Sequence, residues 1–179
     1  HVIGDMPIGT YDNPKQAVIN AKRFLKVGCD SIKFEGCHAD IARAFRENGI
    51  PAVGHIGLTP QTADSFKVRG RDKREAARLK KESRILSRQG VILLILECIP
   101  WLLGKEISRL IKIPTIGIGA GSYCDGQVLV AADMLGLFTR FKPRFVRRYA
   151  NLFEEAVKAV ERFGKDVKAG RYPSKKESY

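Results

Sequence analysis

The sequence predicts an α/β fold built around a parallel sheet. Its 179 residues alternate short, nearly continuous apolar runs with amphipathic helical stretches, the pattern of repeated β-α units. Such apolar runs indicate strands buried on both faces, which is typical of parallel sheets. Charged residues stand where several of the runs end. Because α/β enzymes gather their sites at the carboxyl ends of parallel strands, the same feature points to an active site.

The predicted elements follow one another in strict alternation. Asn13 and Pro14 are suited to the start of the first helix, and Gly28 can end it in a left-handed conformation. Residues 127–138 are compatible with either a strand or a helix. The remaining strands are expected at 2–5, 30–34, 51–55, 91–97 and 114–118, and the helices around 13–27, 38–48, 72–89, 102–111 and 144–167.

The number of strands narrows the fold class. Five strands are clear, and six if 127–131 is counted, whereas a (β/α)8 barrel has eight. The fold is either an open sheet or an incomplete TIM (β/α)8-type barrel that lacks about its first two β/α units. The start of the sequence inside a strand, without an initiator methionine, favours the second. With no linker or internal repeat, we expect a single partial barrel domain over 1–179, with a C-terminal helix and a short tail.

Composition and charge exclude several classes of protein. The net charge is +13, and residues 67–88 contain ten basic and three acidic side chains. These charges fall mainly on the solvated face of the helix expected at 72–89, without interleaved aromatics, so nucleic acid is not an expected partner. No apolar stretch approaches the roughly 20 residues of a membrane span. The four cysteines lack C-x-x-C spacing, which favours reduced thiols and a cytoplasmic location.

The segment IKFEG places Lys33 and Glu35 two residues apart, so both project to one side of a strand. The ammonium group can hold a substrate carboxylate while the carboxylate serves a metal or its waters. A mutual salt bridge at the strand end explains the pair equally well. Asp5 also follows an apolar run, although an isolated aspartate before Met-Pro is more often a turn residue.

Glu97 is harder to explain by structure alone. Six apolar residues precede it, and burial of an unpaired carboxylate costs several kcal/mol, by order of magnitude. Such surroundings favour a general base, whereas the structural alternative is a buried ion pair with Lys33 or another cation. His55 ends another strand and can bond a ligand or be a satisfied, half-buried histidine. The glycine-rich GIGAG lacks the full dinucleotide-binding pattern, and tight packing explains it as well.

Seven segments of the sequence together form a longer pattern: GDMPIGTY, SIKFEG, VGHIGLTPQ, FKVRGR, LILECIP, IPTIGIGAGSYCDGQVLVAADMLG and GRYP. They follow one another in order along essentially the whole chain. This pattern resembles the 3-methyl-2-oxobutanoate (ketopantoate) hydroxymethyltransferase family. The family pattern differs here in four respects: Ile8 follows D-M-P, Cys37 replaces a glycine, the loop before FKVRG is a few residues shorter and lacks a glycine pair, and an Asp-Ser element of an earlier strand has no counterpart.

The resemblance implies a (β/α)8 barrel, a homodecamer, and a one-carbon transfer in pantothenate biosynthesis. A hydroxymethyl group passes from 5,10-methylenetetrahydrofolate to 3-methyl-2-oxobutanoate, giving 2-dehydropantoate through an enolate stabilised by Mg²⁺ or another divalent cation. It also implies roles for individual residues: Glu97 as general base, Lys33 on the keto-acid carboxylate, Asp5 on metal and substrate, Glu35 on the metal, and His55 in the substrate pocket.

Two other functions remain compatible with the sequence. One is an inactive remnant or scaffold of the same family, because a metal-binding element of the pattern has no counterpart. The other is a related metal-dependent lyase or mutase that acts on a different 2-oxo acid, since metal-bound enolates serve those reactions too.

Overall fold

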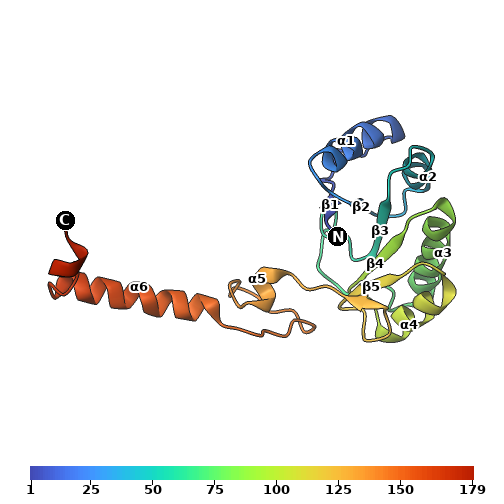
Figure 1. The fold of residues 1–179 in the computed structure, drawn as a ribbon. Helices are drawn as coiled ribbons and strands as arrows, with labels where there is room; N and C mark the ends of the chain where they lie inside the picture. Colours follow the sequence, from blue (N-terminus) through green and yellow to red (C-terminus); the bar gives the residue numbers. More distant parts are fainter. The chain divides into compact units, whose positions relative to one another are not determined.

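The computed structural model describes all of residues 1–179, and six parallel strands form its single sheet. The strands follow in sequential order: β1 (Ile3–Asp5), β2 (Ser31–Glu35), β3 (Ala52–Gly57), β4 (Leu93–Glu97), β5 (Thr115–Ile118) and β6 (Gly126–Gln127). The sheet curves, with helices along one side of it (Figure 1). This confirms the prediction of an incomplete (β/α) barrel, with six of the eight strands of a closed one.

Four helices connect the first five strands: α1 (Pro14–Lys26), α2 (Ala39–Glu47), α3 (Lys73–Gln89) and α4 (Trp101–Leu110). The residues predicted to begin and end these helices do so in the structure. The side chain of Asn13 accepts a hydrogen bond from Gln16 N at 2.9 Å, and Pro14 is the first helical residue. Gly90 ends α3 with φ at 95°. The predicted bounds of these four helices agree with the structure to within one residue.

The hydrophobic core lies between the sheet and these helices. Ile32 and Phe34 of β2 are fully buried, as are Leu94 and Leu96 of β4. The helices contribute buried side chains to the same cluster: Ala17, Ala21, Ile41, Phe45, Leu79, Leu86 and Ile107. Helices α1 to α4 all lie along this one side of the sheet (Figure 1). Burial on both faces is confirmed for β2 and β3 but wrong for β1, β4 and β5, where buried residues alternate with exposed or half-buried ones.

The glycine-rich turn after β5 packs directly against α4. A Cβ atom at Gly121, where φ is +85°, would collide with Cβ of Trp101. Gly104 in turn lies so close to the Ala120 carbonyl oxygen that a side chain would not fit there. Close backbone packing therefore accounts for these glycines, in line with the structural interpretation of GIGAG.

Contacts between Cα atoms divide the chain into two compact units, residues 1–128 and 129–179. The single domain expected over 1–179 stays a prediction. The second unit contains α5 (Ala131–Met134), α6 (Leu152–Lys168) and a 3-10 turn, η1 (Lys175–Glu177). Of the stretch 127–138, which fitted either a strand or a helix, Gln127 ends β6 and residues 131–134 form α5, while the other residues are irregular.

The expected helix over 144–167 begins eight residues late. Residues 144–151 are irregular because their backbone bonds elsewhere: Tyr149 N donates to Met134 O at 2.8 Å, while Leu152 N, at the start of α6, donates to Leu135 O at 3.0 Å. These bonds replace the i to i−4 bonds of a helix. No helix of the chain combines the length and the apolar character needed to cross a bilayer.

Candidate active site

Five ionisable side chains meet where the first four strands end. They are Asp5 of β1, Lys33 and Glu35 of β2, His55 of β3 and Glu97 of β4. The parallel register aligns them, because Asp5 pairs with Lys33, Glu35 with His55, and Gly57 with Glu97. Since alternate residues of a strand share a face, all five side chains project from the face opposite the hydrophobic core. The structure thus brings together every predicted site residue.

Lys33 occupies the middle of one half of this cluster. Its Nζ atom lies 2.8 Å from Oδ2 of Asp5 and 3.6 Å from Oε1 of Glu35. The Lys33 side chain is 13% exposed and that of Glu35 only 3%, whereas Asp5 is 53% exposed. From the sequence, a mutual salt bridge between Lys33 and Glu35 is one of two possible interpretations. The structure shows this contact, but the nearer partner of Lys33 is Asp5.

His55 links the two halves of the cluster. Its Nδ1 atom is 3.6 Å from Oε1 of Glu35, and its Nε2 atom is 3.1 Å from Oε2 of Glu97. The Nε2 contact lacks hydrogen-bond alignment, so this buried nitrogen has no hydrogen-bond partner within the chain. His55 is therefore not a fully satisfied core histidine. The ion pair considered for Glu97 with Lys33 is absent, because His55 takes that place.

Gln61 joins the cluster although the sequence did not single it out. Its backbone N–H donates to Oε2 of Glu35 at 3.0 Å, and its side-chain amide donates to Oδ1 of Asp5 at 3.4 Å and to Met6 O at 3.1 Å. The loop after β3 is thereby fixed over two of the carboxylates. An amide residue four positions beyond the end of a strand gives no periodic signal, and only its place in the T-P-Q segment could have marked it.

Tyr11 is a second residue that sequence reasoning missed. Its ring packs beside Phe34 and His38, and its hydroxyl is buried without a hydrogen-bond partner. Burial raises the pKa of this phenol above its ordinary value. The hydroxyl therefore stays protonated at neutral pH and can donate to a polar ligand group.

The four cysteines are free thiols, as the sequence predicts. Burial raises the pKa of Cys37 and of Cys98 to about 11, with the neighbouring Glu82 or Glu97 acting in the same direction. A thiol with so high a pKa is protonated at neutral pH and is a poor nucleophile. The chemistry of this face therefore rests on the carboxylates, the amine and the imidazole.

The cluster fits a hydrated divalent ion better than a metal caged by protein. No three His, Cys, Asp or Glu side chains of the chain are arranged around a common point. Asp5 and Glu35 nevertheless offer two carboxylates on either side of Lys33. Magnesium typically takes one or two carboxylates and completes its octahedron with water and substrate oxygens. The donor set is compatible with that mode of binding.

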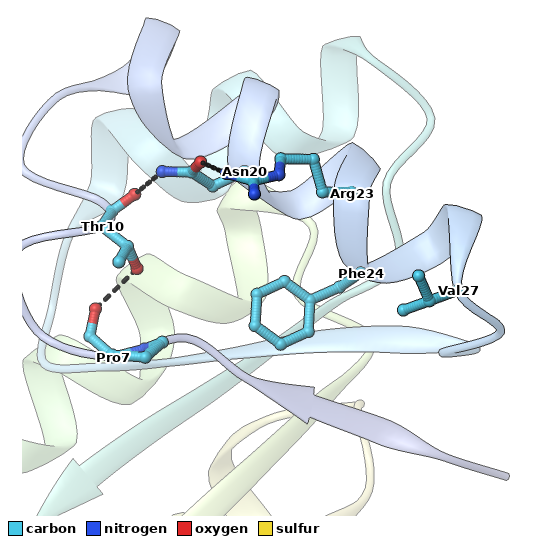
Figure 2. Close-up of a pocket in the computed structure, with 6 residues that line it drawn as sticks. All are labelled: Pro7, Thr10, Asn20, Arg23, Phe24 and Val27. Carbon is cyan, nitrogen blue, oxygen red and sulfur yellow. Dashed lines mark hydrogen bonds between the residues drawn. The ribbon is translucent and has the colours of Figure 1, made fainter.

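A hollow of about 350 Å³ elsewhere lacks such chemistry. It lies between the β1–α1 loop and α1. Figure 2 shows that the side-chain amide of Asn20 donates a hydrogen bond to Thr10 O and that the Thr10 hydroxyl donates one to Pro7 O. Phe24 and Val27 complete its wall. With Arg23 as its single ionisable lining residue, this hollow offers no acid or base to a substrate.

Fold and cluster together define an α/β-barrel type of protein with a candidate active site at the carboxyl ends of its strands. The family model for ketopantoate hydroxymethyltransferase matches residues 1–175. The chain therefore belongs to the ketopantoate hydroxymethyltransferase family, a family of transferases.

Curated relatives support this assignment. The 3-methyl-2-oxobutanoate hydroxymethyltransferase of Chlorobaculum parvum is 48% identical over 99% of this chain and 67% of its own length. Those of Syntrophomonas wolfei and Moorella thermoacetica are each 44% identical, again over 99% of this chain, and over 67% and 69% of their own lengths. The chain thus spans about two thirds of the length of these relatives.

Solved structures support the fold alone. The orotidine 5'-monophosphate decarboxylase of Methanocaldococcus jannaschii matches 90% of this chain and 72% of its own length, with a TM-score of 0.54 and 20% identity. An uncharacterized conserved protein from Geobacillus kaustophilus matches 89% of this chain and 75% of its own, with a TM-score of 0.55 and 12% identity. At such low identity these proteins say nothing about substrate.

Proposed function

We propose that this chain catalyses hydroxymethyl transfer to 3-methyl-2-oxobutanoate, the acceptor in the names of its relatives. The donor in this proposal is 5,10-methylenetetrahydrofolate, and the product is 2-dehydropantoate, a precursor in pantothenate biosynthesis. The observation that carries the proposal is the shared face of Lys33 and Glu97, joined through Glu35 and His55. An amine and a separate carboxylate on one face suit a substrate with a carboxylate at one end and an acidic C–H bond further along.

Lys33 is assigned to the substrate carboxylate. An ammonium group has three N–H donors, and Asp5 and Glu35 approach it from two directions. Its third contact, with His55 Nδ1, is long at 3.5 Å, so this donor can turn to an incoming anion. A charge-assisted bond of this kind is about twice as strong as a neutral one. Lys33 thereby fixes the 2-oxo acid with its C3 atom directed along the cluster toward β4.

Glu97 is assigned to the proton on C3. Its side chain is 14% exposed, so one end of the carboxylate remains accessible while Oε2 rests beside His55. A carboxylate held in this way can take the C3 proton as general base. The C3 carbon then forms a bond to the one-carbon unit of the folate. Both bonds from that carbon to nitrogen break, one replaced by the bond to C3 and the other by a bond to the oxygen of water, and the C3 proton and a proton of the water end on the two nitrogens.

Asp5 and Glu35 would hold the divalent cation. When bound, Mg²⁺ would supply positive charge beside the 2-oxo group and so acidify the C3 proton. Gln61 supports this part of the site, because its bonds to Asp5 and Glu35 orient both carboxylates. The other partners in this proposal are small molecules, the 2-oxo acid and the folate. The proposed assembly is a homo-oligomer, by analogy with the decamer of the family.

Exchange of the C3 proton tests the proposal without folate. The chain with Mg²⁺ and 3-methyl-2-oxobutanoate in deuterated water should lose the C3 proton signal by NMR, and Glu97→Gln should slow this exchange by about 10²- to 10⁴-fold. Glu106→Gln is a matched control, since Glu106 lies on α4 and pairs with Lys80 instead. Equal exchange in Glu97→Gln and the unsubstituted chain would exclude Glu97 as the base.

The ion pairs of the cluster also favour a second candidate, an inactive member of the family. Each charged group except Glu97 already has an oppositely charged neighbour within 4 Å, as in a purely structural network. Absence of exchange in the unsubstituted chain would support this candidate. Exchange without subsequent hydroxymethyl transfer would instead support a lyase or mutase that acts on another 2-oxo acid.

A further inference from the structure

A polar hollow of about 250 Å³ lies beside the carboxylate cluster. The turn after β2 forms one wall through Gly36 and Cys37, and the first half and middle of α3 form another through Arg78 and Glu82. Arg69, from the loop that precedes α3, completes the lining at the end of β3. Two arginines therefore face one hollow at the carboxyl ends of the strands.

The hollow adjoins the proposed active site through consecutive residues. Gly36 directly follows Glu35, and its N–H donates to His55 O at 2.8 Å. Thr59 lines the hollow, while Gln61, two residues further on, contacts Glu35 and Asp5. The loop after β3 therefore has the carboxylate cluster on one side and the hollow on the other.

The charge of the hollow favours an anion. Arg78 is compensated by acids of its own helix, with Nη1 at 2.8 Å from Glu82 and Nη2 at 3.5 Å from Glu75. Arg69 makes no ion pair, and its backbone is fixed by a 2.8 Å hydrogen bond from its N–H to Cys98 O. The hollow therefore keeps one uncompensated guanidinium.

We propose that this hollow binds the glutamyl carboxylates of the folate donor, with Arg69 as their main partner. This inference rests on the proposed function, which supplies the donor. In a folate, a p-aminobenzoyl group separates the reacting methylene carbon from the glutamyl tail. The tail site must therefore lie next to the catalytic cluster and not within it, which is where the hollow lies. The planar guanidinium of Arg69 can donate two parallel hydrogen bonds to a carboxylate.

A pair of stable folate analogues tests the proposal by direct binding. Isothermal titration calorimetry compares 5-formyltetrahydrofolate with the methylamide of 5-formyltetrahydropteroate, which lacks the glutamate and has no carboxylate in its place. The unsubstituted chain should bind the glutamate form about tenfold more tightly, a difference of about 1.4 kcal/mol. Arg69→Gln should abolish this preference, and Arg69→Lys should retain part of it, because charge without the planar fork is less effective.

The matched control is Arg84→Gln, an exposed arginine of α3 that does not line the hollow. It should keep the tenfold preference. If Arg69→Gln does not fold, as judged by circular dichroism, Arg78→Gln provides the test, because it leaves Glu82 uncompensated in the hollow and should weaken the preference as well. Equal binding of both analogues by the unsubstituted chain, or a full preference in a folded Arg69→Gln, would overturn the proposal.

Proton exchange at C3, measured on the unsubstituted chain without folate, separates this inference from the proposed function. The exchange reaction does not involve the glutamyl tail. If the chain prefers the glutamate analogue but does not exchange the C3 proton, the proposed role of Glu97 is contradicted. The assignment of the hollow to the glutamyl carboxylates then still stands. Exchange without tail preference would contradict the assignment of the hollow alone.

Discussion

The two faces of the sheet differ sharply although they are formed by alternate residues of the same strands. On β2, Ile32 and Phe34 are fully buried under the helices, whereas Lys33 and Glu35 face the other way and meet Asp5 and His55. Apolar side chains cover the first face without interruption, whereas charged side chains in contact with one another cover the second. Neighbouring positions of one strand therefore serve stability on one face and the proposed chemistry on the other. Substitutions on the two faces should affect these two properties separately.

The largest expected effect lies on the helix-covered face. Phe34→Ala should lower the free energy of unfolding by about 3–5 kcal/mol, because it removes a fully buried ring that packs against Phe45. Denaturant titration followed by circular dichroism measures this loss. Phe66→Ala is the control, since Phe66 is 75% exposed and should change stability by less than about 0.5 kcal/mol. If both variants lower the free energy of unfolding by a similar amount, the helix-covered face does not contribute to stability more than the exposed surface does.

The next effect belongs to the charged face. Lys33→Met should raise the dissociation constant for 3-methyl-2-oxobutanoate by about 10- to 100-fold, because the substrate carboxylate loses a charge-assisted hydrogen bond and meets Asp5 and Glu35 unshielded. Calorimetric titration with the keto acid measures the change. The exposed Lys81 of α3 supplies the control Lys81→Met, for which unchanged binding is expected. Unchanged binding in Lys33→Met would assign the substrate carboxylate to another cation.

A smaller effect is expected for Gln61. Gln61→Ala removes the side-chain bonds to Asp5 and Met6 and the bond that Gln61 Oε1 accepts from Ile8 N–H, but it leaves the backbone bond to Glu35. C3 exchange should therefore slow by about three- to tenfold. Thr62→Ala lies on the same loop and loses only its contact with Thr59, so exchange there should be unchanged. If both variants slow exchange equally, the effect comes from the loop as a whole and not from the orientation of the carboxylates.

The smallest effect concerns the thiols beside the site. Cys37 and Cys98 have pKa values of about 11 in the folded chain, above the ordinary value of 9.0. The unfolded chain therefore loses these protons at lower pH, so stability is unaffected below pH 9 and falls as the pH rises from about 9 to 11. Alkylation by iodoacetamide, followed by mass spectrometry, should continue to accelerate over this range, beyond the plateau of a free thiol. A plateau near pH 9 would contradict the burial of both thiols.

Much of the fold follows from local signals. Asn13, Pro14 and Gly90 mark helix ends because cap geometry depends on a few consecutive residues, and the apolar runs mark strands because their period is local. The expected helix from residue 144 failed for the opposite reason. There the backbone of Tyr149 bonds to Met134, a partner fifteen residues away that helical periodicity cannot reveal.

The candidate site shows the same division. The residue types at positions 5, 33, 35, 55 and 97 and their places after apolar runs are properties of the sequence, as is the family resemblance. Which atoms approach each other is not, because it depends on the register between strands. Pairing of Glu35 with His55, and of Gly57 with Glu97, places the imidazole between the two glutamates, where the sequence allowed Lys33 as the partner of Glu97.

By itself, therefore, the amino-acid sequence determined that charged residues end buried parallel strands, and to which family the chain is similar. Tertiary structure alone decided that Gln61 bonds to two of the carboxylates and that Arg69 faces a hollow beside them. The physical reason is that strand ends are local features, whereas contacts between loops depend on how distant segments pack across the curved sheet.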